Sequence, residues 1–182
     1  MSRIRPCIIT LALIALIATD VFARGTSEKK HSDAAAPSEL SWATSIQVAP
    51  ELRSEVEDLL RRSPTFRAQY QRIAEAGSVV VGVNIDVRLC ETSYRARTTF
   101  RRYQSGVILA AVAIGPGSHR GEWIAHEFEH ILEQLDGRDL PKLANNHSNG
   151  VWYSGSDVIE TDRAIRAGRT VGDELRQSQK TR

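Results

Sequence analysis

The sequence has little cysteine, little histidine and no long apolar run. It holds 2 Cys and 5 His among 182 residues. Its most apolar stretch, residues 7–18, falls short of the roughly 20 residues that a transmembrane helix needs. Lys and Arg number 24 and Asp and Glu 22, a balance too mild to indicate a nucleic-acid partner. With 41% apolar residues, the chain is expected to bury one ordinary core in a single domain.

The N-terminal residues have the organisation of an export signal. Arg3 and Arg5 precede the apolar run, and Val21 and Ala23 supply small residues at positions −3 and −1 of a cleavage site. The sequence therefore predicts a signal peptide over residues 1–23, a secreted or periplasmic product, and no stable membrane insertion after cleavage. Residues 24–41 lack apolar periodicity, which predicts a disordered linker with His31 in solvent.

Cleavage at that point leaves Cys90 as the one cysteine, so no intramolecular disulfide is expected. A lone cysteine can be a thiol nucleophile. Cys90, however, ends an apolar strand pattern, and we interpret it as a packed structural residue.

Two helices followed by three strands are predicted before residue 115. Pro50 opens the first helix, and Ser63 and Pro64 end it and start the second, which Gly77 stops. Period-two patterns then cover residues 79–89 and 94–101, and a continuously apolar run covers residues 107–114. We expect an α+β fold in which these strands form an antiparallel three-stranded sheet packed against helices. The third strand should be the most buried because it is continuously apolar.

The middle strand of this sheet is rich in arginine. Arg95, Arg97, Arg101 and Arg102 could bind an acidic polymer. We favour a solvated or edge-protecting face, because charged residues commonly prevent an exposed strand from pairing with another chain.

The most informative stretch is residues 123–137, a helical pattern that contains H-E-x-x-H and ends at a glycine. His126 and His130 stand one above the other on one helix face, so both imidazoles can reach one divalent metal. Ile124, Phe128 and Ile131 fall on the opposite face and predict a core contact. Chance pairing of two histidines is the alternative. A metal site is favoured because the pattern lies in a helix that follows a strong strand, in a chain otherwise poor in histidine.

Candidates for a third metal ligand lie downstream of the two histidines. Residues 157–177 have a helical pattern in which Glu160 leads an apolar stripe, and an inward carboxylate is costly to bury unless a cation meets it. Asp157 is the competing ligand, or a group that orients a histidine. His147 could be a third ligand or an oxyanion donor, although a solvated loop residue is favoured. His119 is expected to be a loop or capping residue.

These residues resemble the zincin metallopeptidases, and among them the gluzincin group, in which two histidines and a downstream glutamate bind zinc. The match covers residues 106–175. The resemblance implies a small zincin-like domain over residues 42–178, with a disordered tail over 179–182. It also implies one Zn²⁺ per chain held by His126, His130 and Glu160, with Glu127 as general base acting on a peptide or protein substrate.

The resemblance has limits at three positions. Glu133 and Asp136 stand where metzincins carry glycine and histidine, which excludes that group. Gluzincins commonly carry an aspartate four residues after the ligand glutamate, and here that residue is Ala164. The partner that orients a ligand histidine is therefore unassigned.

The sequence leaves two alternatives open. His126, Glu129 and His130 also satisfy the inverted H-x-x-E-H pattern, and helical geometry does not choose between Glu127 and Glu129 as the base. Glu127 is favoured because the inverted families place their third ligand much farther downstream. A secreted zinc-binding or structural domain without catalysis is the alternative to an enzyme. For an enzyme, Tyr153 or His147 would assist as oxyanion donor.

Overall fold

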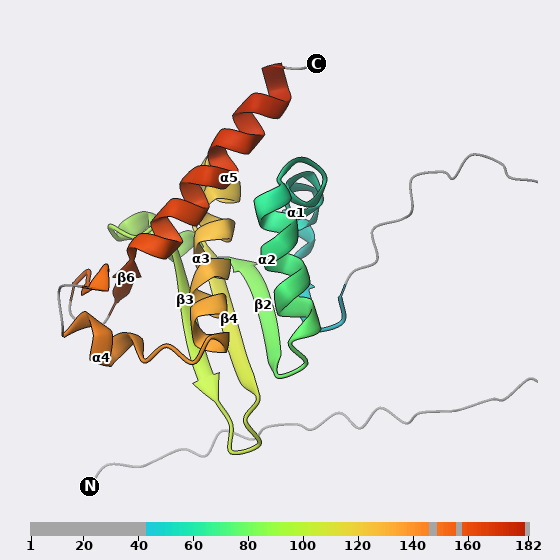
Figure 1. Ribbon diagram of the computed structural model, residues 1–182. Helices are drawn as coiled ribbons and strands as arrows, with labels where there is room; N and C mark the ends of the chain where they lie inside the picture. Colours follow the sequence, from blue (N-terminus) through green and yellow to red (C-terminus); the bar gives the residue numbers. More distant parts are fainter. Residues whose placement is uncertain (1–42, 146–148, 156–157, 181–182) are drawn as a thin grey trace, which may run out of the picture. The chain divides into compact units, whose positions relative to one another are not determined.

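The computed structural model describes residues 43–145, 149–155 and 158–180, so the predicted signal peptide (1–23) and linker (24–41) lie outside the described residues. The described residues belong to one compact unit, residues 39–182. Its elements follow in the order β1 (Ile46–Val48), α1 (Pro50–Arg62), α2 (Pro64–Glu75), β2 (Val79–Ile85), η1 (Val87–Glu91), β3 (Ala96–Arg102), β4 (Ile108–Ile114), α3 (Arg120–Leu135), α4 (Leu140–Ala144), β5 (Val151–Tyr153), β6 (Ile159–Thr161) and α5 (Asp162–Lys180) (Figure 1).

The two predicted N-terminal helices are confirmed. Pro50 occupies the first turn of α1, and Ser63 is both the C-cap of α1 and the N-cap of α2. The Ser63 hydroxyl accepts a hydrogen bond from the Phe66 amide at 2.9 Å, which satisfies one free donor of the α2 N-terminus. Gly77, at φ +62°, turns the chain out of α2 toward β2.

The sheet is mixed, and the predicted antiparallel three-stranded order is wrong. The strand order is β1-β2-β4-β3, in which β2 pairs in parallel with both β1 and β4, and only β3 with β4 is antiparallel. The sequence reading missed β1 altogether. The composition of β3 explains the difference, because a strand rich in exposed arginine suits an edge, whereas the apolar strands β2 and β4 suit the interior.

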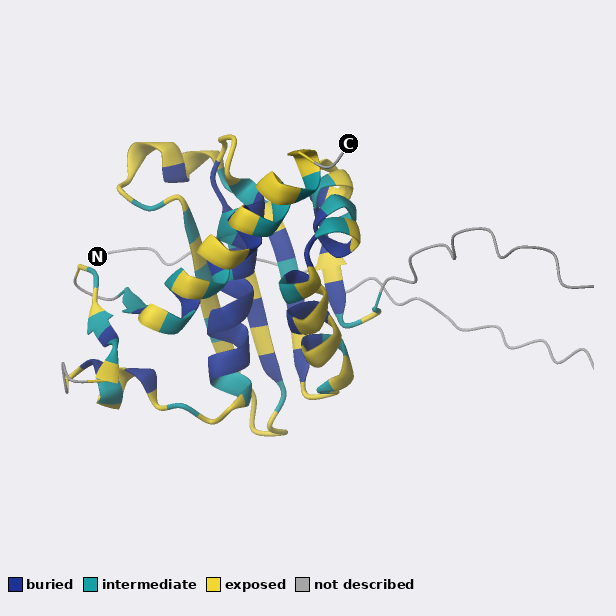
Figure 2. Cartoon of the chain, turned by 45° about the horizontal axis from the view of Figure 1, so that its top comes forward, coloured by how far each residue is buried: buried dark blue, intermediate teal, exposed yellow. Residues whose placement is uncertain are grey.

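The helices cover one face of this sheet (Figure 1). Inward residues of β2 and β4 form a core with α1, α2 and α3, and buried and exposed residues alternate along both strands (Figure 2). The third predicted strand, residues 107–114, is the most buried of the three, as expected, with Ile108, Ala110, Val112 and Ile114 in the core. Leu109 and Ala111 are exposed, since no described element covers the outer face there.

Strand β2 ends earlier than its sequence pattern indicated. It stops at Ile85, and the chain enters the short 3₁₀ helix η1, whose N-cap is Asp86. Only Leu89 of this helix is buried. Cys90 is exposed, so the interpretation of Cys90 as a packed residue is wrong. A 3₁₀ turn does not keep the alternation of a strand, and the apolar pattern carried no signal of the change.

The C-terminal part also differs from the prediction. The last helix was expected over residues 157–177, but α5 begins at Asp162 and continues to Lys180, and β6 precedes it. The predicted tail is therefore helical at residues 179–180, while 181–182 lie outside the described residues. Strand β6 pairs with β5 as an antiparallel hairpin.

Helix α5 packs closely on α3. A Cβ atom added at Gly168 would lie 2.9 Å from the backbone oxygen of Glu122 and 3.3 Å from the Cβ of His126. Glycine at this position therefore allows α5 to approach the face of α3 that carries the predicted ligands. Across the described ranges, no helix has the length and apolar character that crossing a membrane would require.

Candidate metal centre

The first part of the site comes from α3. His126 and His130 lie one turn apart with ring centroids separated by 4.9 Å. His130 is buried, and His126 is partly exposed. On the opposite face, Ile124, Phe128 and Ile131 are fully buried in the core. The sequence periodicity of α3 predicts this separation of a histidine face from an apolar face. Because α3 packs on the core through the apolar face, both imidazoles lie on the same opposite side of the helix.

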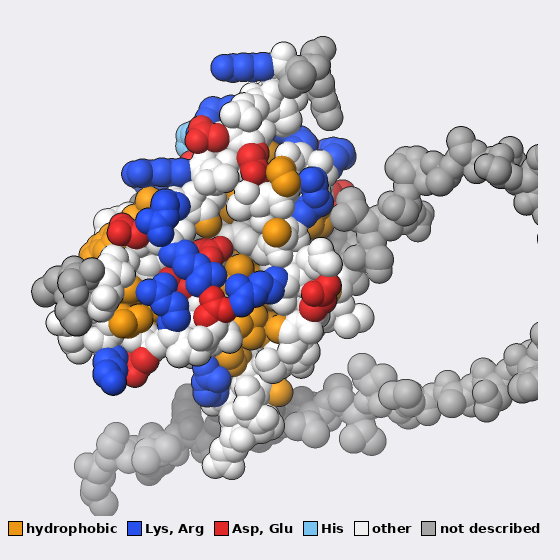
Figure 3. Space-filling model, in the orientation of Figure 1, with side chains coloured by type: hydrophobic (Ala, Val, Ile, Leu, Met, Phe, Trp, Pro, Cys, Tyr) orange, Lys and Arg blue, Asp and Glu red, His pale blue; other side chains and the backbone are white. Residues whose placement is uncertain are grey.

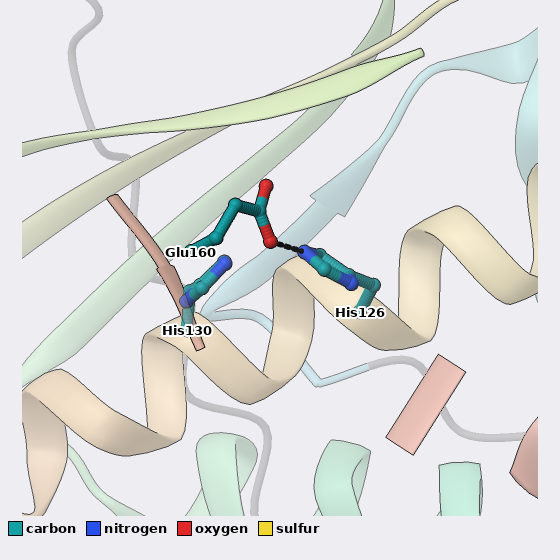
Figure 4. A group of neighbouring side chains, drawn as sticks. All are labelled: His126, His130 and Glu160. Atoms are coloured by element: carbon teal, nitrogen blue, oxygen red, sulfur yellow. Dashed lines mark ion pairs between the residues drawn. The ribbon is translucent and has the colours of Figure 1, made fainter. Parts of the chain in front are cut away.

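The third member comes from the hairpin. Glu160 lies on β6, and its carboxylate points toward the two imidazoles (Figure 4). The Glu160 Oε2 atom is 3.1 Å from His126 Nε2, and one candidate ligand atom from each of the three residues lies within 4.8 Å of the other two. These residues could hold a metal ion. Glu160, the residue predicted as the third ligand, therefore lies in this group. It comes from a strand and not from the helical stripe on which it was predicted.

The charges around the site favour an ionised carboxylate. Burial alone would raise the pKa of Glu160, but the hydrogen bond and charge of His126, together with the charge of His130, outweigh it and lower that pKa. An ionised carboxylate beside two imidazoles is a donor set that suits a divalent cation.

Glu127 faces the same space from the next position of α3. It is buried, and it accepts a hydrogen bond of 2.6 Å from the Thr98 hydroxyl of β3. Burial raises the pKa of Glu127 despite the opposing charges of His130 and His126. A carboxylate that gains proton affinity beside a group of potential metal ligands has the properties of a general base.

Glu129 lies on the other side of α3. Its carboxylate accepts a hydrogen bond of 2.6 Å from Gln69 of α2 and another from Arg163 of α5. Arg163 also pairs with Asp136 at 2.6 Å, and acidic and basic side chains are intermixed on the helical face of the unit (Figure 3). Glu129 thus joins three helices and does not face the candidate metal ligands.

Glu133 is the residue that the sequence reading missed. It is 0% exposed, and one carboxylate oxygen lies 3.0 Å from His130 Nδ1. Arg138 donates to the other oxygen at 2.6 Å, and the Thr161 hydroxyl donates at 3.1 Å to the oxygen that faces His130. The signal was available: an acidic residue three positions after a helical histidine lies on the same face.

A cleft of about 470 Å³ opens over the site. Strand β3 forms one wall with residues 96–100, and Leu140, Pro141, Val158 and Ile159 form the other. Glu127, His130 and Glu160 lie among the lining residues between the two walls. The second wall has its own small apolar cluster, in which Leu140, Ala144 and Val151 are buried. A ligand can therefore reach His130, Glu160 and Glu127 from solvent between two distinct walls.

The remaining predicted residues do not join this group. Tyr153 ends β5 with 40% of its surface exposed and is absent from the described lining of the cleft. His119 is the N-cap residue of α3, as expected of a loop or capping histidine, and its nearest acidic partner is Glu122 at 3.5 Å. Asp157, His147 and His31 lie outside the described residues.

No protein-family model, curated protein or solved structure matches the chain.

Proposed function

We propose that the protein is a zinc-dependent hydrolase of the zincin type that cleaves peptide bonds. One observation carries the proposal: His126, His130 and Glu160 converge beside a buried carboxylate, Glu127, and His130, Glu160 and Glu127 line an open cleft. Two imidazole nitrogens and one carboxylate oxygen are the donor set of many catalytic zinc sites, where a fourth position stays open for water. The donor chemistry therefore fits Zn²⁺, one ion per chain.

In this proposal, separate residues would bind the metal and transfer the proton. His126, His130 and Glu160 would hold the ion, which when bound lowers the pKa of water and polarises a carbonyl. Glu127, held by Thr98, would accept a proton from the attacking water and return it to the leaving amine. The raised pKa of Glu127, caused by burial, suits a group that must take up and release a proton near neutral pH. We assign no oxyanion donor among the described residues.

The free edge of β3 supports a peptide as the substrate. The Arg95 carbonyl accepts from Gly115 at 2.8 Å, and Tyr103 donates to Val107 at 2.9 Å, so the odd-numbered residues of β3 bond to β4. The amide and carbonyl groups of Ala96, Thr98 and Phe100 therefore point away from β4, along the wall of the cleft. An extended peptide can pair with these groups as an added strand.

Export remains part of the proposal. Residues 1–23 would direct the chain out of the cytoplasm and be removed after Ala23, and hydrolysis would then take place outside the cytoplasm. Sequencing the N-terminus of the mature protein tests this step. A mature chain that begins at Arg24 is expected, and retention of residues 1–23 would contradict it.

The function is tested by hydrolysis of a labelled, unstructured protein such as casein. Glu127→Gln should lower the rate by about 10²- to 10⁴-fold and leave one zinc per chain, because the general base is lost and the ligands remain. Glu122→Gln is the matched control, since Glu122 lies on the same helix but bonds to Arg176 outside the cleft. Full activity of Glu127→Gln would contradict the proposal. Zinc binding without hydrolysis in the wild type would favour the non-catalytic alternative.

A further inference from the structure

The edge strand β3 and the residue before it carry four arginines that form no ion pair with any acidic residue the structure describes. Arg95, Arg97, Arg101 and Arg102 are all exposed, and within the described ranges none of them forms an ion pair. Asp86 lies close enough to Arg97 for that charge to help lower the Asp86 pKa, but Arg88 already bonds both Asp86 oxygens at 2.9 Å. The positive charge of this strand is therefore largely uncompensated.

The strand geometry places Arg97 and Arg101 on one face. Side chains alternate along a strand, so Arg97, Thr99 and Arg101 project to the outer face, whereas Ala96, Thr98 and Phe100 face the helices. Arg97 lies opposite Ala113, and Arg101 lies opposite Leu109, both on β4. Neither neighbour carries a charge. The two guanidinium groups thus border the outer side of the free strand edge.

A peptide added to this edge would meet the arginines in a fixed register. Residues directly opposite each other in paired strands place their side chains on the same face. Peptide residues opposite Ala96, Thr98 and Phe100 would face the candidate metal centre. Residues opposite Arg97 and Arg101, four positions apart, would lie beside the guanidinium groups.

From this register we propose that the substrate is an extended acidic segment, with Asp or Glu at the two positions that face Arg97 and Arg101. The inference rests on the proposed function, because it names the substrate class of the same cleft. Opposite charges across paired strands favour association, and each pair should improve binding by about 1.5- to 5-fold. The preference should weaken in high salt, since both guanidinium groups are exposed.

Edge protection is the competing explanation for the arginines. It predicts charges that keep other strands away without choosing between substrates. The opposite edge of the sheet offers a comparison, because the outward residue of β1 is Gln47. Within the described part of the sheet, arginines therefore gather at the edge that borders the cleft and not at both edges.

The test compares three synthetic peptides that differ only at two positions four residues apart, where they carry Asp, Gln or Lys. The wild type should cleave the Asp peptide with a kcat/KM about 2- to 25-fold above that of the Gln peptide, and it should cleave the Lys peptide more slowly than the Gln peptide. The double reversal Arg97→Glu with Arg101→Glu should invert the order. The double variant Arg97→Gln with Arg101→Gln should remove the preference. It replaces the double Glu variant if that protein does not fold.

The matched control is Arg53→Glu with Arg169→Glu, two exposed arginines on α1 and α5 that change the net charge equally. It should keep the preference for the Asp peptide. Equal cleavage of all peptides by an active wild type, or an unchanged preference in the double reversal, would overturn the inference and leave the proposed function standing. A wild type that cleaves neither the peptides nor casein would refute both.

Discussion

His130 Nδ1 lies 3.0 Å from a carboxylate oxygen of Glu133, one helical turn farther along α3. A neutral His130 that donates from Nδ1 presents the lone pair of Nε2 to the metal position. Glu133 is itself held by Arg138 and Thr161. Because Thr161 also accepts a hydrogen bond from the Ala164 amide at 3.0 Å, the orientation of His130 depends on the junction of β6 and α5.

Glu133→Gln is predicted to weaken zinc binding by about 10- to 100-fold, because His130 loses the carboxylate that orients it. Competition with a chelator of known affinity measures the change. Glu122→Gln serves again as the control on α3. Unchanged zinc affinity in a destabilised Glu133→Gln protein would assign Glu133 to stability alone.

Glu129→Gln is predicted to lower stability but to leave the zinc affinity and the rate per folded molecule nearly unchanged. The neutral amide would lose the charged bond to Arg163 of α5, at a cost of about 1–3 kcal/mol. Chemical denaturation and casein hydrolysis together check this. Loss of hydrolysis in a folded, zinc-loaded Glu129→Gln protein would mean that Glu129 is the base.

Gly168→Ala is predicted to destabilise the protein by about 1–3 kcal/mol and to weaken zinc binding. The new Cβ would meet the Glu122 backbone oxygen at 2.9 Å and the His126 Cβ at 3.3 Å, so α3 or α5 must shift.

Gly172→Ala is the matched control for that change. Its Cβ would meet the Glu122 side chain at 2.4 Å from Oε1 and 2.8 Å from Cγ. That side chain is flexible and can rotate away, and the gain in helix propensity of about 1 kcal/mol offsets the displacement. Equal stability of the two variants would show that the helices are not in such close contact.

Zinc affinity is predicted to weaken as the pH is lowered. The loss should begin above pH 6.5, the ordinary pKa of histidine. Burial by itself lowers the pKa of His130, but the hydrogen bond to Glu133 and the charge of Glu127 raise it overall. A protonated imidazole cannot bind metal, so affinity is complete above this raised pKa and is lost as the pH falls through it. Titrations at a series of pH values locate the midpoint. Glu133→Gln should move the midpoint to lower pH, and an unmoved midpoint would contradict this assignment.

The helices and the histidine pair could be predicted from local patterns. Pro50, Ser63 and Gly77 mark boundaries through backbone chemistry that acts within a few residues, and His126 and His130 share a face because of helical geometry alone. Such signals need no tertiary context.

The strand order and the position of Glu160 could not be predicted without tertiary context. Parallel pairing of β2 with β4 is a long-range arrangement that no single strand pattern contains, and the apolar residues of β4 gave no sign that Leu109 would be exposed. The sequence pattern puts Glu160 on a helix, but in the structure Glu160 lies on β6 just before α5. The structure brings Glu160 beside His126 and His130 from that strand, and its role as a metal ligand stays a prediction.

Anomalous diffraction at the zinc edge from crystals of the zinc-loaded protein tests the central claim most directly. One ion is predicted at about 2.0–2.2 Å from a nitrogen of His126, a nitrogen of His130 and an oxygen of Glu160, with the fourth position open to the cleft beside Glu127. An ion bound elsewhere, or a fourth protein ligand that closes the site, would contradict the account.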